Sequence, residues 1–99
     1  GVKIVCGSDA AWANYKMGRF QGEIDAHVGI GMSPIEAIAS ATNRSAQSCW
    51  MEDAIGSLEV NKQADILIVD GDASQDVNAL WNVKDIFQAG KRIDREDKI

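Results

Sequence analysis

The sequence is poor in the residues that build self-contained catalytic or metal centres. It has one histidine, one proline and two cysteines in 99 residues. A single histidine offers no convincing Ser–His–Asp arrangement, and Cys6 and Cys49 lack the spacing of paired metal ligands. We expect both thiols to be free and buried in apolar surroundings, as in a cytoplasmic protein, rather than joined in a disulfide.

Basic charge and long apolar runs are also lacking. Ten Lys and Arg residues stand against fifteen Asp and Glu residues, which gives a net charge of −5. Phosphate binding needs a basic patch, so this balance argues against a nucleic-acid partner. No apolar stretch approaches the roughly 20 residues of a membrane span. The apolar fraction of 45% is instead typical of a small folded globular protein.

The first half of the chain predicts one strand followed by two helices. Val2 to Cys6 is apolar apart from Lys3 and rich in β-branched residues, which predicts a strand buried on both faces, as in parallel sheets. A loop follows over 7–16. Apolar residues then recur at helical spacing, which predicts a helix over 17–29.

The clearest local signal is the start of the second helix, predicted over 34–48. Ser33 is a helix N-cap, Pro34 suits the first helical position, and Glu36 completes a capping box. The helix carries an apolar stripe made of Ile35, Ile38, Thr42 and Cys49.

The second half predicts short antiparallel strands. A buried strand is expected over 64–69 and a helical turn over 77–81. A hairpin should follow, with a strand over 83–89, a turn at Gly90-Lys91 and a short strand over 92–94. The single parallel strand at the start has no partner of its own in this arrangement. We therefore expect the chain to be the C-terminal piece of a larger protein.

Few side chains are candidates for chemistry. Asp9 follows the C-terminal end of the predicted parallel strand, the edge where α/β proteins place active sites, although a loop carboxylate can also cap a backbone turn. Trp12 and Tyr15 could line a substrate pocket or cover a barrel rim. His27 shares its helical phase with Ile24, so it is expected to be a packed or half-exposed helix residue rather than a ligand.

Four segments together resemble a known family: "GVKIVCGSDA", "GMSPIEAIASATNRSA", "IGSLEVNKQADILIVDGD" and "VKDIFQAGKRI". In order and spacing they are similar to the C-terminal part of the metal-dependent amidohydrolase superfamily, especially its imidazolonepropionase-like and Xaa-Pro dipeptidase-like members. The family has Pro-Gly-Lys where this chain has Val60-Asn61-Lys62, and Asn also tolerates the left-handed conformation.

The resemblance implies an α/β fold in two portions. Residues 1–53 would supply the last strand and closing helices of a (β/α)8 TIM barrel. Residues 54–99 would supply the C-terminal strands of a small composite β-sandwich.

The resemblance also implies a function. Asp9 would bind a divalent metal, preferably zinc, and act as general base. Trp12 and Tyr15 stay candidate substrate contacts from their place in the loop after Asp9 alone. The reaction would be hydrolysis of a C–N bond in a small amide, cyclic amide or peptide-like molecule. The family's other metal ligands are missing from these residues, so the chain alone should be inactive and should self-associate through its unpaired apolar surfaces. The alternative is a free-standing small α/β domain with a binding or structural role.

Overall fold

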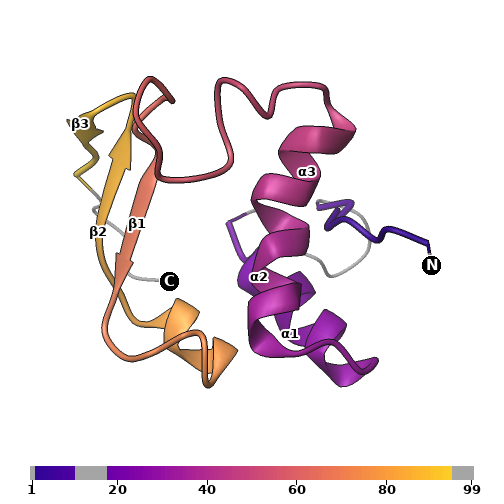
Figure 1. The fold of residues 1–99 in the computed structure, drawn as a ribbon. Helices are drawn as coiled ribbons and strands as arrows, with labels where there is room; N and C mark the ends of the chain where they lie inside the picture. Colours follow the sequence, from indigo (N-terminus) through magenta and orange to yellow (C-terminus); the bar gives the residue numbers. More distant parts are fainter. Residues whose placement is uncertain (1, 11–17, 95–99) are drawn as a thin grey trace.

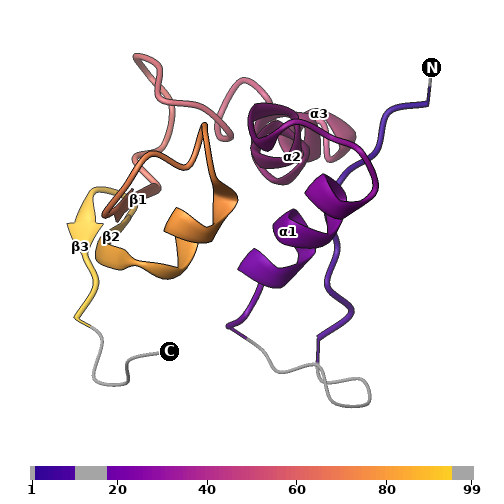
Figure 2. The same ribbon diagram turned by 90° about the horizontal axis from the view of Figure 1, so that it is seen from below.

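The computed structural model describes residues 2–10 and 18–94 and has the expected α/β character (Figure 1). Its elements follow in the order α1 (Gln21–Gly29), α2 (Pro34–Ala41), α3 (Asn43–Ser48), β1 (Ile66–Val69), η1 (Val77–Trp81), β2 (Val83–Gln88) and β3 (Lys91–Arg92). The helices form one layer and the three-stranded sheet another, and the 3-10 helix η1 lies at the base between them (Figures 1 and 2). None of the helices in the described ranges is long and apolar enough to cross a membrane.

Helix α2 begins where the sequence predicts. The Oγ of Ser33 accepts a hydrogen bond from the backbone N–H of Glu36 at 3.2 Å, and Pro34 occupies the first helical position. The same hydroxyl donates to the Glu36 carboxylate at 3.0 Å. These contacts satisfy one of the four backbone donors that a helix leaves without intrahelical partners at its start.

The prediction of one helix over 34–48 is wrong, because the helix breaks at Thr42, where φ is −122° and ψ is −98°. The carbonyl of Ser40 accepts two bonds from outside the helical ladder. One comes from the backbone N–H of Cys6 at 3.0 Å and the other from the hydroxyl of Ser45 at 2.7 Å. These donors replace the regular helical partner where α2 ends, and α3 continues beyond the break along nearly the same axis (Figures 1 and 2).

The break also overturns the prediction that both cysteines are buried. Cys6 is half-buried, but Cys49 is exposed at the end of α3. A residue after the break no longer follows the phase of α2, so Cys49 leaves the apolar stripe that a continuous helix would have given it.

The sheet is antiparallel, with strand order β1-β2-β3. Its hairpin turn is Ala89-Gly90, one residue earlier than predicted, and φ is positive at both residues, 51° and 80°. Tight two-residue hairpins require this conformation because it matches the twist of the strands. The last strand is accordingly shorter and earlier than the predicted 92–94.

The buried core joins the two halves of the chain. Ile24 and Ala37 from the helices pack with Val77 and Leu80 from η1. Polar contacts reinforce this junction. The side-chain amide of Gln21 donates to the Leu80 carbonyl at 3.3 Å, and the guanidinium of Arg19 lies over the Trp81 ring at 4.7 Å from the ring centroid.

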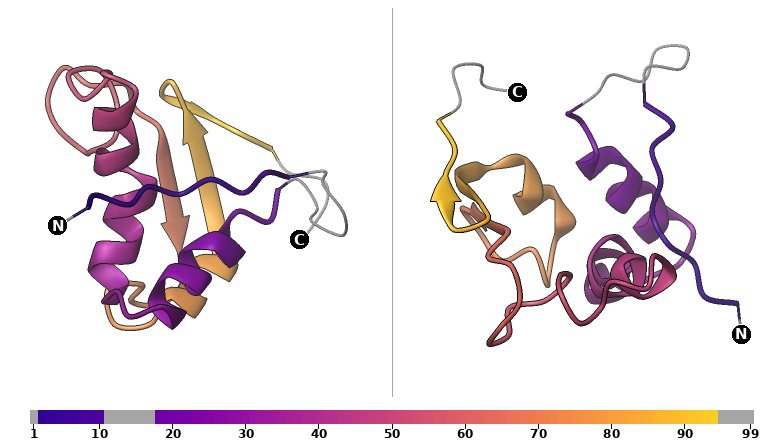
Figure 3. Two further views of the ribbon diagram at one scale, coloured as in Figure 1. Left: turned by 90° about the vertical axis from the view of Figure 1, so that its right-hand side faces the viewer. Right: turned by 90° about the horizontal axis from the view of Figure 1, so that it is seen from above.

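Residues 2–6 form no strand, contrary to the sequence prediction. The segment runs extended along the helices, on the side away from the sheet (Figure 3). Val2 is 91% exposed and Val5 is 38% exposed. A β-strand needs a hydrogen-bonded neighbouring strand. Within residues 2–6, the one backbone hydrogen bond to the rest of the described chain is from the Cys6 N–H to the Ser40 carbonyl, which lies on a helix.

Candidate functional site

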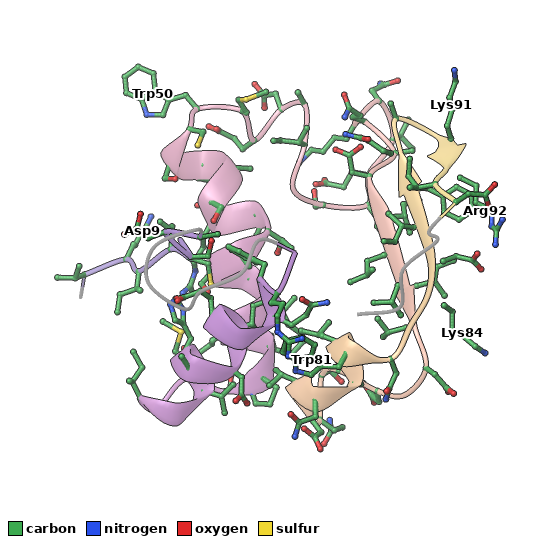
Figure 4. All side chains as sticks on the ribbon, turned by 180° about the vertical axis from the view of Figure 1, so that it is seen from behind. Asp9, Trp50, Trp81, Lys84, Lys91 and Arg92 are labelled. Atoms are coloured by element: carbon green, nitrogen blue, oxygen red, sulfur yellow. The ribbon has the colours of Figure 1, made fainter. Side chains whose placement is uncertain are left out.

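Asp9 lies exposed at the end of the extended segment. Its φ of 50° puts it in the left-handed region, which side-chain-bearing residues adopt infrequently. The neighbouring Ser8 Oγ accepts the backbone N–H of Ala10 at 3.2 Å, which closes a tight turn around the aspartate. In Figure 4 Asp9 lies on the helical side of the molecule, remote from the labelled cations of the sheet, Lys84, Lys91 and Arg92.

Trp12 and Tyr15, the two predicted substrate contacts, lie outside the described residues. Their role stays a prediction.

Three residues before Asp9, the chain is fixed to the helices by a cluster of Cys6, His27 and Ser40. The Nδ1 of His27 lies 3.0 Å from the Oγ of Ser40. The sulfur of Cys6 lies 3.3 Å from the same Oγ and 3.6 Å from His27 Nδ1. His27 is 8% exposed and Ser40 is fully buried. Of the two expected settings, packed or half-exposed, the structure shows His27 packed.

The hydrogen bonds of the cluster determine where its protons lie. The Ser40 hydroxyl donates to the Ala37 carbonyl at 2.6 Å, so its only proton is committed. Its oxygen can therefore only accept, from the Nδ1–H of His27 and the S–H of Cys6. In this arrangement His27 donates from its Nδ1–H to the Ser40 oxygen.

The cysteine of this cluster is not an activated nucleophile. Burial raises the pKa of the Cys6 thiol above its ordinary value, and the Glu23 carboxylate raises it further. A reactive cysteine needs the opposite, a lowered thiol pKa. The cluster is thus suited to holding the segment rather than to covalent chemistry.

Sequence reasoning proposed Asp9 as a site residue, which stays a prediction, and did not single out Ser40. Ser40 stands in the alanine-rich stretch "AIASAT", where a serine carries no pattern of its own. The one available signal was a small polar residue at a helix position that faces the core.

The described residues do not complete a metal centre. Residues 2–10 and 18–94 contain no group of three His, Cys, Asp or Glu side chains that could hold an ion. The exposed carboxylate of Asp9 suits one oxygen ligand of a divalent cation, whereas the imidazole of His27 is occupied within the cluster. Any further ligands would have to come from beyond these residues.

The profile of the amidohydrolase family matches residues 1–93. This chain belongs to the amidohydrolase family. The resemblance identified from the four sequence segments is therefore confirmed.

Individual amidohydrolases align with the chain over short parts of their length. It is 33% identical over 78 residues to a 5-methylthioadenosine/S-adenosylhomocysteine deaminase of Teredinibacter turnerae, spanning 71% of this chain and 18% of that protein. It is 48% identical over 40 residues to an imidazolonepropionase of Symbiobacterium thermophilum, spanning 40% of this chain and 9% of that protein.

Among solved structures, a Xaa-Pro dipeptidase with methionine bound in its active site superposes with a TM-score of 0.86 at 35% identity. The match covers 96% of this chain and 23% of that one. The chain thus spans less than a quarter of each amidohydrolase described here.

Proposed function

We propose that this chain is the C-terminal portion of a metal-dependent hydrolase that cleaves C–N bonds in small amides, cyclic amides or peptide-like molecules. Family membership and the short share of each relative that the chain spans support this assignment. The observation that carries it is Asp9, an exposed carboxylate in a strained conformation at the end of a segment anchored to the helices. In this proposal residues 1–53 complete a (β/α)8 barrel and residues 54–99 belong to the composite β-sandwich.

Asp9 has two roles in the proposed reaction, as one ligand of a divalent cation, preferably zinc, and as general base. A cation bound there would lower the pKa of a water molecule to about 7. As general base, the Asp9 carboxylate would accept a proton from the water that attacks the substrate carbon. As the C–N bond breaks, the protonated Asp9 returns the proton to the leaving nitrogen.

The choice of probe substrates follows the relatives. Their names include a deaminase, an imidazolonepropionase and a Xaa-Pro dipeptidase. The test therefore uses the longer protein, expressed from the reading frame that contains this chain and its upstream sequence. It is incubated with a Xaa-Pro dipeptide, 5-methylthioadenosine and imidazolonepropionate.

We expect hydrolysis of at least one probe, lost on chelation of divalent cations and restored by Zn²⁺. The 99-residue chain alone should turn over none. Turnover that survives chelation, or failure of the zinc-loaded protein on all three probes, would contradict the proposal.

The free-standing domain remains the second candidate, and the shared core of Ile24, Ala37, Val77 and Leu80 favours it. The two proposals differ in how the isolated chain behaves. Large apolar side chains such as Val2, Leu58 and Val60 are exposed, and Leu67 and Ile68 of β1 are partly open. The amidohydrolase proposal predicts self-association of the chain through these surfaces. Light scattering that finds a stable monomer at high concentration would favour the free-standing domain.

A further inference from the structure

We propose that His27 and Ser40 are positioning residues for Asp9, fixing the backbone that leads into it and thereby the place of its carboxylate. This inference rests on the proposed function of Asp9. It adds two residues that lie on other elements, α1 and α2, and that have no chemical part in the reaction.

The first support is how the segment is held. Within the ranges 2–10 and 18–94, the hydrogen bonds that join the segment 2–10 to the rest of the chain all run to Ser40 or His27. The backbone N–H of Cys6 donates to the Ser40 carbonyl, and the Cys6 sulfur contacts both side chains. Among the residues that the structure describes, hydrogen bonds therefore attach the segment at one point, three residues before Asp9.

The second support is the rigidity of that point. Ser40 is fully buried, and besides the segment its side-chain and carbonyl contacts involve all three helices. Its hydroxyl donates to Ala37 within α2, its carbonyl accepts from Ser45 of α3, and its Oγ faces His27 of α1. A residue bonded in this way has one orientation, so the segment attached to it inherits that orientation.

The third support is the short connection to Asp9. Gly7 and Ser8 separate Cys6 from the aspartate, and the turn at Ser8 and Ala10 sets the left-handed conformation. A shift at Cys6 is therefore passed on to the carboxylate with few bonds to absorb it. A misplacement of about 1 Å at a reacting group can cost about a hundredfold in rate.

Substitutions at His27 separate positioning from packing. An asparagine places its side-chain amide where Nδ1 lies and can still donate to Ser40, whereas a glutamine places its amide closer to the position of Nε2. In the longer protein, assayed with the probe substrate that it hydrolyses, we expect His27→Gln and Ser40→Ala to lower kcat about tenfold to a hundredfold, with KM changed less than about twofold. His27→Asn should retain kcat to within about threefold.

The matched control is Ser48→Ala. The Ser48 hydroxyl makes a similar helix contact, donating to the Ser45 carbonyl at 2.8 Å, but it is exposed and distant in sequence from the segment. Its kcat should equal that of the parent. Circular dichroism of every variant verifies the fold. If Ser40→Ala loses the parental spectrum, the comparison of kcat between His27→Asn and His27→Gln tests the inference instead.

The decisive readout is a double-mutant cycle with Asp9→Asn. If Ser40 acts through Asp9, adding Ser40→Ala to Asp9→Asn should lower kcat by less than about twofold further. Amide hydrogen exchange gives a readout independent of activity. The Cys6 amide should exchange faster in Ser40→Ala than in the parent, and its exchange rate in Ser48→Ala should equal that of the parent.

Three results would overturn the inference. They are parental kcat in Ser40→Ala, equal kcat in His27→Asn and His27→Gln, and an undiminished effect of Ser40→Ala in the Asp9→Asn background. Parental kcat in Asp9→Asn itself would instead overturn the proposed function, and this inference with it.

Discussion

The carboxylate of Asp65 accepts a hydrogen bond from the backbone N–H of Ala89 at 2.9 Å. This contact ties the residue before β1 to the turn between β2 and β3. Beside it, the Gly90 N–H donates to the Ala64 carbonyl at 2.9 Å. The hairpin turn, whose residues have positive φ, is thus held from the neighbouring strand.

The first prediction is that this contact depends on pH. The hydrogen bond from Ala89 lowers the pKa of Asp65, and the one from Gln63 adds to the effect. A carboxyl whose folded pKa is depressed stabilises the fold above its unfolded pKa, here 3.8, and loses that contribution as the pH falls through the lower folded value. The urea midpoint of Asp65→Ala should lie below that of the parent at pH 7, and the difference should shrink below about pH 4. A difference that is constant with pH would contradict this.

The second prediction concerns the start of α2. Ser33→Ala removes the side-chain acceptor of the Glu36 N–H and should lower the free energy of unfolding by about 1 kcal/mol. Urea unfolding of the two chains measures the difference. Ser48→Ala, which removes a hydroxyl from the end of α3, is the control and should stay near the parent. Equal unfolding curves for Ser33→Ala and the parent would mean that the cap adds no stability.

A third prediction tests the close approach of Gly56 to the helix junction. A Cβ on Gly56 would lie 2.7 Å from the Cβ of Ala46 and 3.1 Å from the Cα of Asn43, and φ is +99°. Gly56→Ala should therefore destabilise the chain by about 2 kcal/mol or more, from overpacking and backbone strain together. Gly90→Ala is the matched control, since its φ is +80° with open space around it. Thermal melting should show a clearly smaller loss for Gly90→Ala, and similar losses would refute the steric account.

The two cysteines give a fourth prediction. Cys49 is exposed, whereas Cys6 is half-buried with a raised thiol pKa. Because the thiolate is the species that reacts, a pulse of iodoacetamide at pH 8 should label Cys49 well before Cys6. Peptide mapping by mass spectrometry measures both sites in one sample, and the urea-unfolded chain serves as the control with similar labelling of both. Faster labelling of Cys6 in the folded chain would contradict the cluster geometry.

Local signals in the sequence predicted the elements that depend on local physics. The cap at Ser33, the helical turn at 77–81 and the strand that became β1 were identified because capping chemistry and apolar runs act within a few residues. The break at Thr42 could not be predicted, because it depends on donors from Cys6 and Ser45 that only the folded chain brings to one carbonyl.

The candidate site likewise has parts that a local sequence pattern indicates and parts that depend on the folded chain. Asp9 is a candidate from its place after an apolar segment and from the family resemblance, and its role stays a prediction. The prediction of a strand over residues 2–6 was wrong for this chain, because strand pairing depends on neighbours that a local sequence pattern does not reveal. The contribution of Ser40 depends on three elements meeting at one buried residue, and no spacing rule contains that information.

The most direct test of the central claim is the turnover of Asp9→Asn in the longer, zinc-loaded protein. The asparagine amide has nearly the same shape as the carboxylate but cannot accept the proton of the water. The account predicts a fall in kcat of about a hundredfold or more with the fold retained. Asp53→Asn, a change at another exposed carboxylate, should leave kcat at the parental value. A metal-loaded Asp9→Asn protein with parental kcat would show that Asp9 is not the base.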